Sequence, residues 1–370
     1  MLHINDFKFR LKEKSENLFF NGNHKRTKFN SNLIPFEEIL FNKNVSTLVT
    51  LGPKSSTPSS IEAISDYTKL FRLNGSHNTI DWHLKVSKLI RKSCPKGLIL
   101  LDIPGVKPRT NNKKIIEVKK GETLEFYHTR SSSYQEFRKI ELTKPLPKIP
   151  KAPNSFSLSD GLYGFDLLEV SQNYILGRSR NDFHLQPKKG LNIPESIYDD
   201  ALQMKAYSKF LNLARNIEFD AIGLSFIQNQ RTIENIRLKF PDKLMVSKIE
   251  NKLALENAVE IVNSSDIVMI DRGDLFAEIG IKDFYEAILK ITEASKSHGR
   301  PLIMATENLE SMQYRLQPSK SEIIALQHSI NLGTNILMLS DETATSDLYM
   351  NTIRWLDGFL QLQQEQKFIY

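Results

Sequence analysis

The sequence predicts an α/β protein: a closed (β/α)8 TIM barrel with a small all-β lid domain inserted after its third strand. Eight short apolar or β-branched segments alternate with helical stretches from Ser46 onward. Continuous apolar strands are typical of parallel sheets, which are covered on both faces. The alternation breaks once, after the third segment, and the length of 370 residues suits a barrel of about 250 residues plus an insertion.

The strands are predicted from the apolar segments and the helices from the amphipathic stretches between them. The predicted strands are Ser46–Gly52, Lys69–Asn74, Gly97–Asp102, Ala221–Phe226, Leu244–Glu250, Asp266–Arg272, Pro301–Thr306 and Asn335–Ser340. The predicted helices include Asp81–Lys92, Ile233–Phe240, Leu253–Val262, Phe284–Lys296, Ser321–Leu332 and Thr352–Gln363.

The insertion is predicted from a change in composition. Its turns are rich in serine and proline, and its short alternating segments, such as Ile115–Val118 and Glu122–Phe126, are typical of half-buried strands. The polar N-terminal segment is expected to be an extension that packs weakly. The predicted domains are an extension at 1–43, a barrel at 44–109 and 191–370, and a lid at 110–190.

Composition narrows the class of protein. The 50 Lys and Arg residues exceed the 43 Asp and Glu residues, for a net charge of +7, but the two signs are interleaved and form no long basic block. We therefore expect no nucleic-acid partner. No run of 18 apolar residues predicts a membrane span. The single cysteine, Cys94, excludes an intramolecular disulfide, and Met1–Arg10 lacks a secretory signal pattern, so we expect a cytoplasmic enzyme.

Charged and hydroxyl residues follow most of the predicted strands. Each is also typical of a solvated loop or a helix cap, but the carboxyl ends of parallel barrel strands converge on one face, where active sites lie. Their number on separate strand ends therefore predicts an active site. These residues are Arg72, Asp102, Lys248, Glu250, Asp274, Thr306 and Ser340.

Several segments resemble motifs of the pyruvate kinase family and occur in that family's order. Two are especially specific, Ser247-Lys248-Ile249-Glu250-Asn251 and Arg272-Gly273-Asp274-Leu275. The resemblance covers about residues 46–350, and Asp160-Gly161 and Lys188-Lys189-Gly190 resemble the family's lid domain. The other matching segments are Leu51-Gly52-Pro53, Arg72-Leu73-Asn74-Gly75-Ser76-His77, Leu101-Asp102 with Arg109-Thr110, Ser225-Phe226-Ile227, Ala305-Thr306 with Leu309-Glu310-Ser311-Met312, and Ser340 with Glu342-Thr343-Ala344.

The resemblance implies a phosphotransferase that uses Mg²⁺ or Mn²⁺. Glu250 and Asp274 would hold the ion, because hard cations bind carboxylates and phosphates. Lys248 and Arg72 would stabilise charge on the transferring phosphoryl group. Thr306 matches the threonine near the family's substrate methyl and carboxylate groups.

The resemblance also implies two sites for small ligands. For phosphoenolpyruvate or pyruvate, the backbone amides of Gly273 and Asp274 would bind the carboxylate at a helix start, with Ser225 and Thr306 nearby. Trp82 would stack on an adenine, although a core position on its helix is equally consistent with the pattern. The residues implied around ADP or ATP are Pro53, Asn74, His77, Trp82, Arg109 and Lys189.

A monovalent-cation site would map onto Asn74, Ser76 and Asp102. Members of the family that need K⁺ carry glutamate where this chain has Lys107, and cation-independent members carry lysine there. We therefore expect Lys107 to replace K⁺, because an ammonium group supplies the same charge. The alternative is that Lys107 is a solvent-facing loop residue.

The chain departs from the family pattern at several positions. Asp271 replaces a small residue, Phe276 replaces glycine, and Glu307 follows Thr306 where the family has glutamine. The Ser319-Lys320 pair replaces a Thr-Arg pair that helps the family's subunits meet. No segment matches the family's C-terminal allosteric domain, so we expect insensitivity to sugar phosphates and a monomer or homodimer.

Three functions stay open on the sequence. The first is phosphoryl transfer between phosphoenolpyruvate and ADP. The second is an ATP-dependent kinase of another small 2-hydroxy acid or related acceptor, which the altered residues favour. The third is an inactive homologue that acts as a binding protein, which the retained Lys248, Glu250, Asp274 and Arg72 disfavour.

Overall fold

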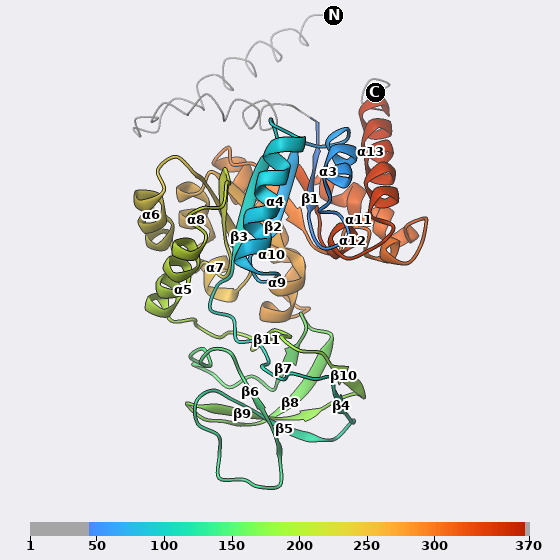
Figure 1. Cartoon of the computed structure of the whole chain (residues 1–370). Coiled ribbons are helices and arrows are strands. Elements are labelled where there is room, and N and C mark those ends of the chain that lie inside the picture. The colour runs from blue at the N-terminus through green and yellow to red at the C-terminus, as the bar shows by residue number, and fades with distance from the viewer. Residues whose placement is uncertain (1–43, 367–370) are drawn as a thin grey trace, which may run out of the picture. The chain divides into compact units, whose positions relative to one another are not determined.

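The computed structural model describes residues 44–366 and confirms the predicted (β/α)8 barrel (Figure 1). The predicted extension at 1–43 lies outside the described residues. Eight parallel strands form a closed barrel in the order β1-β16-β15-β14-β13-β12-β3-β2. Their bounds are β1 Ser46–Thr50, β2 Leu70–Asn74, β3 Leu98–Ile103, β12 Ala221–Leu224, β13 Leu244–Ile249, β14 Ile267–Asp271, β15 Leu302–Ala305 and β16 Ile336–Leu339.

The helices lie outside the strands (Figure 1). Six of them, α3, α4, α5, α6, α7 and α11, begin at a polar side chain that accepts a hydrogen bond from the first turn. Ser319 and Glu322 form a reciprocal capping box at the start of α11. The bounds are α3 Pro58–Ser65, α4 Ile80–Ser93, α5 Asp200–Leu213, α6 Gln230–Lys239, α7 Lys252–Glu256, α8 Ala258–Ser264, α9 Arg272–Ile279, α10 Phe284–Ser297, η2 Glu310–Gln313, α11 Lys320–Asn331, α12 Asp341–Ala344 and α13 Tyr349–Gln366.

One predicted helix, Leu253–Val262, is instead two helices, α7 and α8. They meet at Asn257, whose backbone departs from helical geometry at ψ 21°. Its side-chain amide donates a 2.8 Å hydrogen bond to the carbonyl of Gln228. The long-range hydrogen bond favours the break, and no periodicity in the sequence reveals it.

The barrel interior is a packed core rather than a channel. The cavity that remains among the apolar side chains at one level of the barrel has a volume of about 10 Å³. This is no more than the space of a single water molecule. The side chains that surround it are Leu48, Leu70, Leu98, Leu100, Ala221, Val246, Ile303 and Ile336. This rigid core holds the strand ends at fixed positions.

The inserted segment forms an all-β lid with its own apolar core. A six-stranded sheet has the order β11-β7-β8-β9-β5-β6, and β10 pairs with β4. Phe156 and Phe165 stack with ring centroids 5.0 Å apart, and Gly177 leaves room for the Phe156 ring. The bounds are β4 Ile116–Val118, β5 Thr123–Tyr127, β6 Arg138–Glu141, β7 Ser155–Leu158, β8 Tyr163–Val170, β9 Tyr174–Ser179, β10 Phe183–Leu185 and β11 Leu191–Asn192, so that β11 lies just beyond the predicted boundary at 190.

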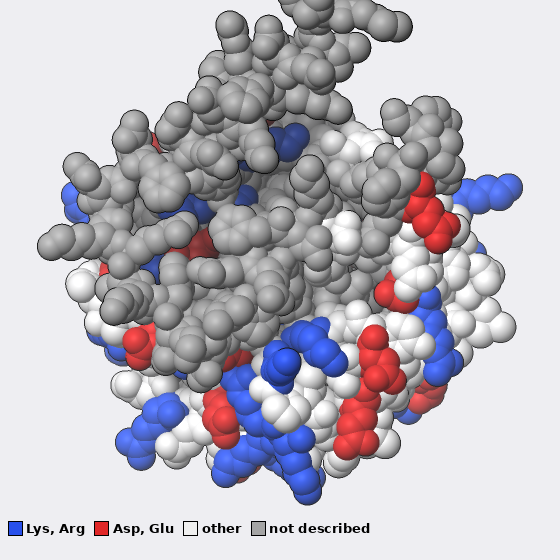
Figure 2. All heavy atoms as spheres, turned by 90° about the horizontal axis from the view of Figure 1, so that it is seen from above, with Lys and Arg blue, Asp and Glu red and all other residues white. Residues whose placement is uncertain are grey.

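Basic and acidic side chains are interspersed among the described residues that are visible in Figure 2. Within residues 44–366, no helix combines the length and hydropathy that a membrane crossing requires.

Candidate active site

The strand-end residues predicted from the sequence converge at the carboxyl ends of the barrel strands. Lys248 and Glu250 are two residues apart, so they point to the same side of β13. The β13–β14 register pairs Ile249 with Ile270, which places Glu250 beside Asp271. Asp274 follows in the first turn of α9. The local sequence and the sheet register thus bring these charges into one cluster.

Lys248 lies at the centre of this cluster. Its Nζ is 2.7 Å from Glu250 Oε1 and 3.2 Å from both Asp102 Oδ2 and Asp271 Oδ2. Burial lowers the pKa of the Lys248 ammonium, but the surrounding carboxylates outweigh it and hold the pKa well above its usual value. The side chain is therefore a fixed positive charge.

Arg72 is a second buried cation and is held by Asp102. Its Nε and Nη2 donate to Asp102 Oδ2 at 2.9 and 2.7 Å, and its Nη1 donates to Thr50 Oγ1 at 3.1 Å. Ser225 Oγ donates to the other oxygen of Asp102 at 2.9 Å. Burial raises the pKa of Asp102, but Lys248 and Arg72 outweigh it and the net pKa is lowered. Asp102 thus positions both cations.

Three carboxylates could together hold a metal ion. One oxygen from each of Glu250, Asp271 and Asp274 lies within 4.8 Å of the others. Glu250 Oε1 is buried, and its polar partner within residues 44–366 is the Lys248 ammonium at 2.7 Å. An all-oxygen set of largely buried carboxylates fits a hard divalent cation such as Mg²⁺ or Mn²⁺.

Burial perturbs the titration of these acids. It raises the pKa of Glu250 well above its usual value, against the opposing effect of Lys248. It also raises the pKa of Asp274 to about 6, although Lys107 lowers it. A divalent cation would favour the ionised form of both groups.

Thr306 lies beside Asp271 and caps the start of α9. The Gly273 amide donates to Thr306 Oγ1 at 3.0 Å, and this hydroxyl lies 3.2 Å from Asp271 Oδ1. Thr306 has φ 61°, which is unusual for a β-branched residue and costs about 1–3 kcal/mol. The Gly273 amide, predicted to bind a substrate carboxylate, is therefore already partnered by Thr306.

Lys107 lies beside Asp274 of the carboxylate cluster. Its Nζ donates to Asp160 of the lid at 2.8 Å and also to Asp274 Oδ1, and the side chain is only 4% exposed. Burial lowers the pKa of Lys107, but Asp160 and Asp274 outweigh it and raise the pKa above its usual value. Within residues 44–366, no hydrogen bond or ion pair joins Lys107 to Asn74, Ser76 or Asp102.

Asn74, Ser76 and Asp102 make other contacts. Asn74 Oδ1 accepts from the Ser76 amide at 3.1 Å, which closes the turn after β2. Asp102 is occupied by Arg72, Ser225 and Lys248. Direct contacts therefore do not bring Lys107 together with Asn74, Ser76 and Asp102, and the replacement of K⁺ by Lys107 stays a prediction.

The residues predicted around a nucleotide lie at the end of β2 and in the loops that follow β1, β2 and β3, in the first turn of α4 and in the lid. Burial lowers the pKa of His77, and the nearby charges of Arg109 and Lys189 lower it further. Trp82 is half-buried in the first turn of α4 and packs partly against the barrel core, while Pro53 is exposed. Stacking of Trp82 on a base stays a prediction.

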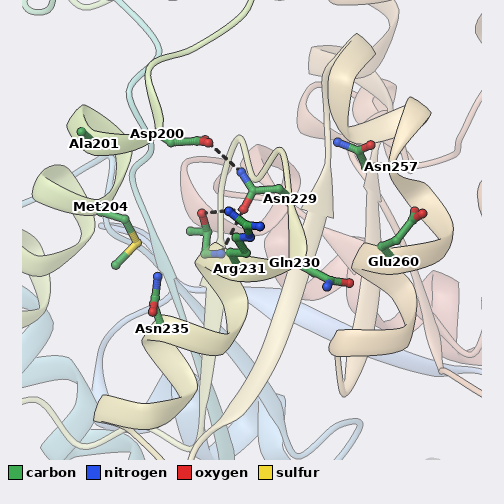
Figure 3. Close-up of a pocket in the computed structure, with 10 residues that line it drawn as sticks. Asp200, Ala201, Met204, Asn229, Gln230, Arg231, Asn235, Asn257 and Glu260 are labelled. Atoms are coloured by element: carbon green, nitrogen blue, oxygen red, sulfur yellow. Dashed lines mark hydrogen bonds between the residues drawn. The ribbon is translucent and has the colours of Figure 1, made fainter.

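A separate groove of about 590 Å³ lies between α5, α6 and α8 (Figure 3). Asp200 and Asn229 are hydrogen-bonded to each other on its wall at 2.9 Å. The groove shares no residue with the carboxylate cluster, so it is not part of the candidate active site.

Glu278 is a buried acid that the sequence analysis missed. It is 1% exposed and accepts hydrogen bonds from Asn192 Nδ2 at 2.9 Å and from the Tyr198 hydroxyl at 3.1 Å. Burial raises its pKa to about 8. Its position four residues after Asp274 places both on one face of α9, which is the signal that the sequence offered.

We predict that Glu278→Gln makes the protein less sensitive to alkaline pH. The folded-state pKa exceeds the usual value of 4.5, so the folded protein binds more protons between about pH 4.5 and 8. Stability contributed by this group therefore falls as pH rises through that window, and the amide avoids the loss.

The measurement is urea unfolding of both proteins in EDTA at pH 5 and pH 8.5. We expect equal stability at pH 5 and a gain of about 2 kcal/mol or more for the variant at pH 8.5. A constant difference between the two proteins at both pH values would contradict the assignment.

Comparison with known proteins agrees with this geometry. The family profile described as "Pyruvate kinase, barrel domain" matches residues 42–353. Pyruvate kinase of Encephalitozoon cuniculi is 30% identical over 315 residues, which cover 83% of this chain and 72% of that protein. Pyruvate kinase of Thermotoga maritima is 28% identical over 327 residues, which cover 85% of this chain and 70% of that protein.

Pyruvate kinase of Thermococcus litoralis is also 28% identical, over 86% of this chain and 70% of its own length. The profile match spans the barrel strands, the lid and every strand-end residue in the charge cluster. With the barrel closed and Lys248, Glu250 and Asp274 brought together at its mouth, the chain belongs to the pyruvate kinase family.

Proposed function

We propose that the protein transfers a phosphoryl group between phosphoenolpyruvate and ADP, the reaction that makes pyruvate and ATP. The observation that carries the proposal is the position of Lys248, whose buried ammonium lies within 3.2 Å of carboxylates from three barrel strands. A fixed cation beside a carboxylate cluster that fits Mg²⁺ is suited to phosphoryl transfer, which depends on positioning and charge stabilisation.

The residues of the cluster would have two roles, metal binding and charge stabilisation. Glu250 and Asp274 would hold a divalent cation, which when bound supplies positive charge to substrate oxygens. Lys248 and Arg72 would stabilise negative charge on the transferring group and on the enolate oxygen. The rigid hydrogen bonds from Arg72 to Asp102 and Thr50 reduce the reorganisation that this requires.

Thr306 would act near the carbon that gains a proton when the enolate becomes pyruvate. Its hydroxyl hydrogen bonds to Ala305 at 2.7 Å or to Asp271 at 3.2 Å, and its oxygen accepts from the Gly273 amide. A substrate carboxylate that binds the Gly273 amide would replace Thr306 as its acceptor. The released hydroxyl could then face the substrate.

A second candidate function is an ATP-dependent kinase of another small 2-hydroxy acid or related acceptor. The contact between Asp271 and Thr306 favours it, because a carboxylate there adds negative charge and a hydrogen-bond acceptor beside the substrate position. An acceptor with an additional hydroxyl or amine donor would satisfy that carboxylate better than a methyl group would.

The deciding experiment is a lactate dehydrogenase-coupled assay with phosphoenolpyruvate, ADP and Mg²⁺. We expect turnover that exceeds that of a Lys248→Ala preparation. If none is found, phosphorylation of 2-hydroxy acids with radiolabelled ATP tests the second candidate. Failure of both reactions, with nucleotide binding retained, would favour a binding protein without catalysis.

We further propose that turnover does not require K⁺, because the buried Lys107 ammonium supplies a fixed positive charge beside Asp274. The measurement compares turnover in tetramethylammonium buffer with and without KCl at matched ionic strength. We expect stimulation well below roughly tenfold. A larger stimulation would show that the Lys107 ammonium does not replace K⁺.

The variant Lys107→Glu should instead depend on K⁺, or be inactive if the altered loop cannot form a cation site. A matched control is Lys113→Glu, which makes the same charge change at an exposed position in the lid. The control should keep the wild-type response to KCl.

A further inference from the structure

We propose that Asp271 is a third protein ligand of the divalent cation, beside Glu250 and Asp274, so that the chain binds the ion firmly before any substrate arrives. The inference rests on the proposed metal site but not on the identity of the phosphoryl acceptor. It concerns a position where the family carries a small residue, and it follows from how Asp271 is held.

The backbone places Asp271 at the cluster. It is the last residue of β14, and the register that pairs Ile249 with Ile270 brings it beside Glu250 at the end of β13. Asp274 lies three residues later, in the first turn of α9. The three carboxylates therefore come from two adjacent strand ends and the helix that follows, all anchored in the barrel core.

The Asp271 side chain does not cap α9, although Asp271 is the N-cap residue of that helix. It occupies the N-cap of α9, where an aspartate ordinarily accepts a hydrogen bond from the first turn and contributes about 1 kcal/mol. Asp271 makes no such bond, and the Gly273 amide donates to Thr306 Oγ1 instead, at 3.0 Å. Because Thr306 accepts from the first turn of α9, the Asp271 carboxylate faces the cluster instead, with Oδ2 3.2 Å from Lys248 Nζ and Oδ1 3.2 Å from Thr306 Oγ1.

The charge balance of the cluster favours an additional cation. The carboxylates of Asp102, Glu250 and Asp271 surround the single ammonium of Lys248 within 3.2 Å. Arg72 pairs only with Asp102 among these acids, and Lys107 is shared between Asp274 and the lid residue Asp160. Asp271 is 6% exposed, so water screens its charge poorly.

One oxygen of Glu250 is held by an ion pair alone. Glu250 is fully buried, and within residues 44–366 the polar partner of its Oε1 is the Lys248 ammonium, at 2.7 Å. Its other oxygen accepts from the Phe226 amide at 2.6 Å. One carboxylate oxygen of Glu250 lies within the 4.8 Å group that also contains oxygens of Asp271 and Asp274.

A third carboxylate has a definite consequence for the ion. Mg²⁺ sites built on one or two carboxylates keep several waters and rely on substrate phosphates for further ligands. A third carboxylate replaces one water and adds one negative charge, so affinity in the absence of substrate should increase. Lys248 would keep its contacts with Asp102 and Ser225 when Asp271 turns to the ion.

The test is Mn²⁺ binding to the full chain without substrate. Free Mn²⁺ is measured by electron paramagnetic resonance, and water-proton relaxation reports the number of waters on the bound ion. The variants are Asp271→Ala, which removes the ligand, and Asp271→Asn, which keeps the size and removes the charge. Circular dichroism and thermal unfolding confirm that each variant is folded, and the two variants make the test independent of either one alone.

We expect Asp271→Ala to weaken Mn²⁺ binding by about tenfold or more, because even indirect partners of metal ligands contribute about 10- to 100-fold. The bound ion should also gain about one water. Glu250→Gln serves as the positive control and should weaken binding as well.

Unchanged or tighter Mn²⁺ binding in both Asp271 variants, with an unchanged number of waters, would overturn the proposal. It would mean that Asp271 only positions Lys248 and Thr306. Because no turnover is measured, this failure is distinct from failure of the proposed phosphoryl transfer, which the coupled assay tests separately.

Discussion

Replacing Lys248 by alanine is expected to lower turnover by about 10²–10³ or more while nucleotide binding is largely retained. The Lys248 ammonium is buried, fixed by three carboxylates and adjacent to the cluster that fits a metal ion. Its charge is already in place before the reaction, so its loss raises the barrier for phosphoryl transfer directly. Steady-state turnover and equilibrium binding of ADP measure the two effects separately.

The same substitution leaves Asp102, Glu250 and Asp271 without their shared cation. Removing one partner of a buried ion pair typically costs about 3–5 kcal/mol, so thermal unfolding must be measured beside activity. Lys248→Arg retains the positive charge, so it tests whether lost turnover in Lys248→Ala results from unfolding. Lys92→Ala, at an exposed position on α4, is the matched control and should behave as wild type. Near wild-type turnover in folded Lys248→Ala would exclude Lys248 as the central charge.

Changing Glu250 to glutamine or Asp274 to asparagine is expected to weaken the apparent affinity for Mg²⁺ by about tenfold or more in each case. Each change removes one negative charge with little change of shape. Both carboxylates belong to the group whose oxygens lie within 4.8 Å of one another. The measurements are the Mg²⁺ dependence of turnover and Mn²⁺ binding without substrate.

A matched control is Glu256→Gln on α7, where the side chain is exposed. It makes the same chemical change outside the cluster and should leave the metal dependence unaltered. If Glu250→Gln and Asp274→Asn both keep the wild-type metal dependence, the ion binds elsewhere in the protein.

The barrel itself could be predicted closely because its signal is local. Each of the eight strands is a short apolar segment, and the structure places all eight within the predicted ranges or one residue beyond them. For example, the predicted Lys69–Asn74 corresponds to β2 at Leu70–Asn74. The lid was predicted for the same reason, since the loss of helical periodicity is visible in the sequence.

Helix boundaries were less predictable where long-range contacts decide them. The helix α5, Asp200–Leu213, was not predicted, although Asp199 caps it by accepting from the Leu202 amide at 2.9 Å. The predicted Leu253–Val262 helix divides at Asn257 because its amide bonds to Gln228 in a different βα unit. The Asn257–Gln228 hydrogen bond joins residues that are 29 apart in sequence, whereas the Asp199 cap of α5 is a local signal that the sequence offered.

The sequence by itself determined that Arg72, Asp102, Lys248, Glu250 and Asp274 would gather at one end of the barrel, because parallel strand ends must converge. Only the tertiary structure decided which charges touch. It placed Lys107 on Asp160 and Asp274, turned Asp271 away from its helix cap, and buried Glu278 against Asn192 and Tyr198. These contacts depend on sheet register, rotamers and burial across separate elements, which no local pattern of residues specifies.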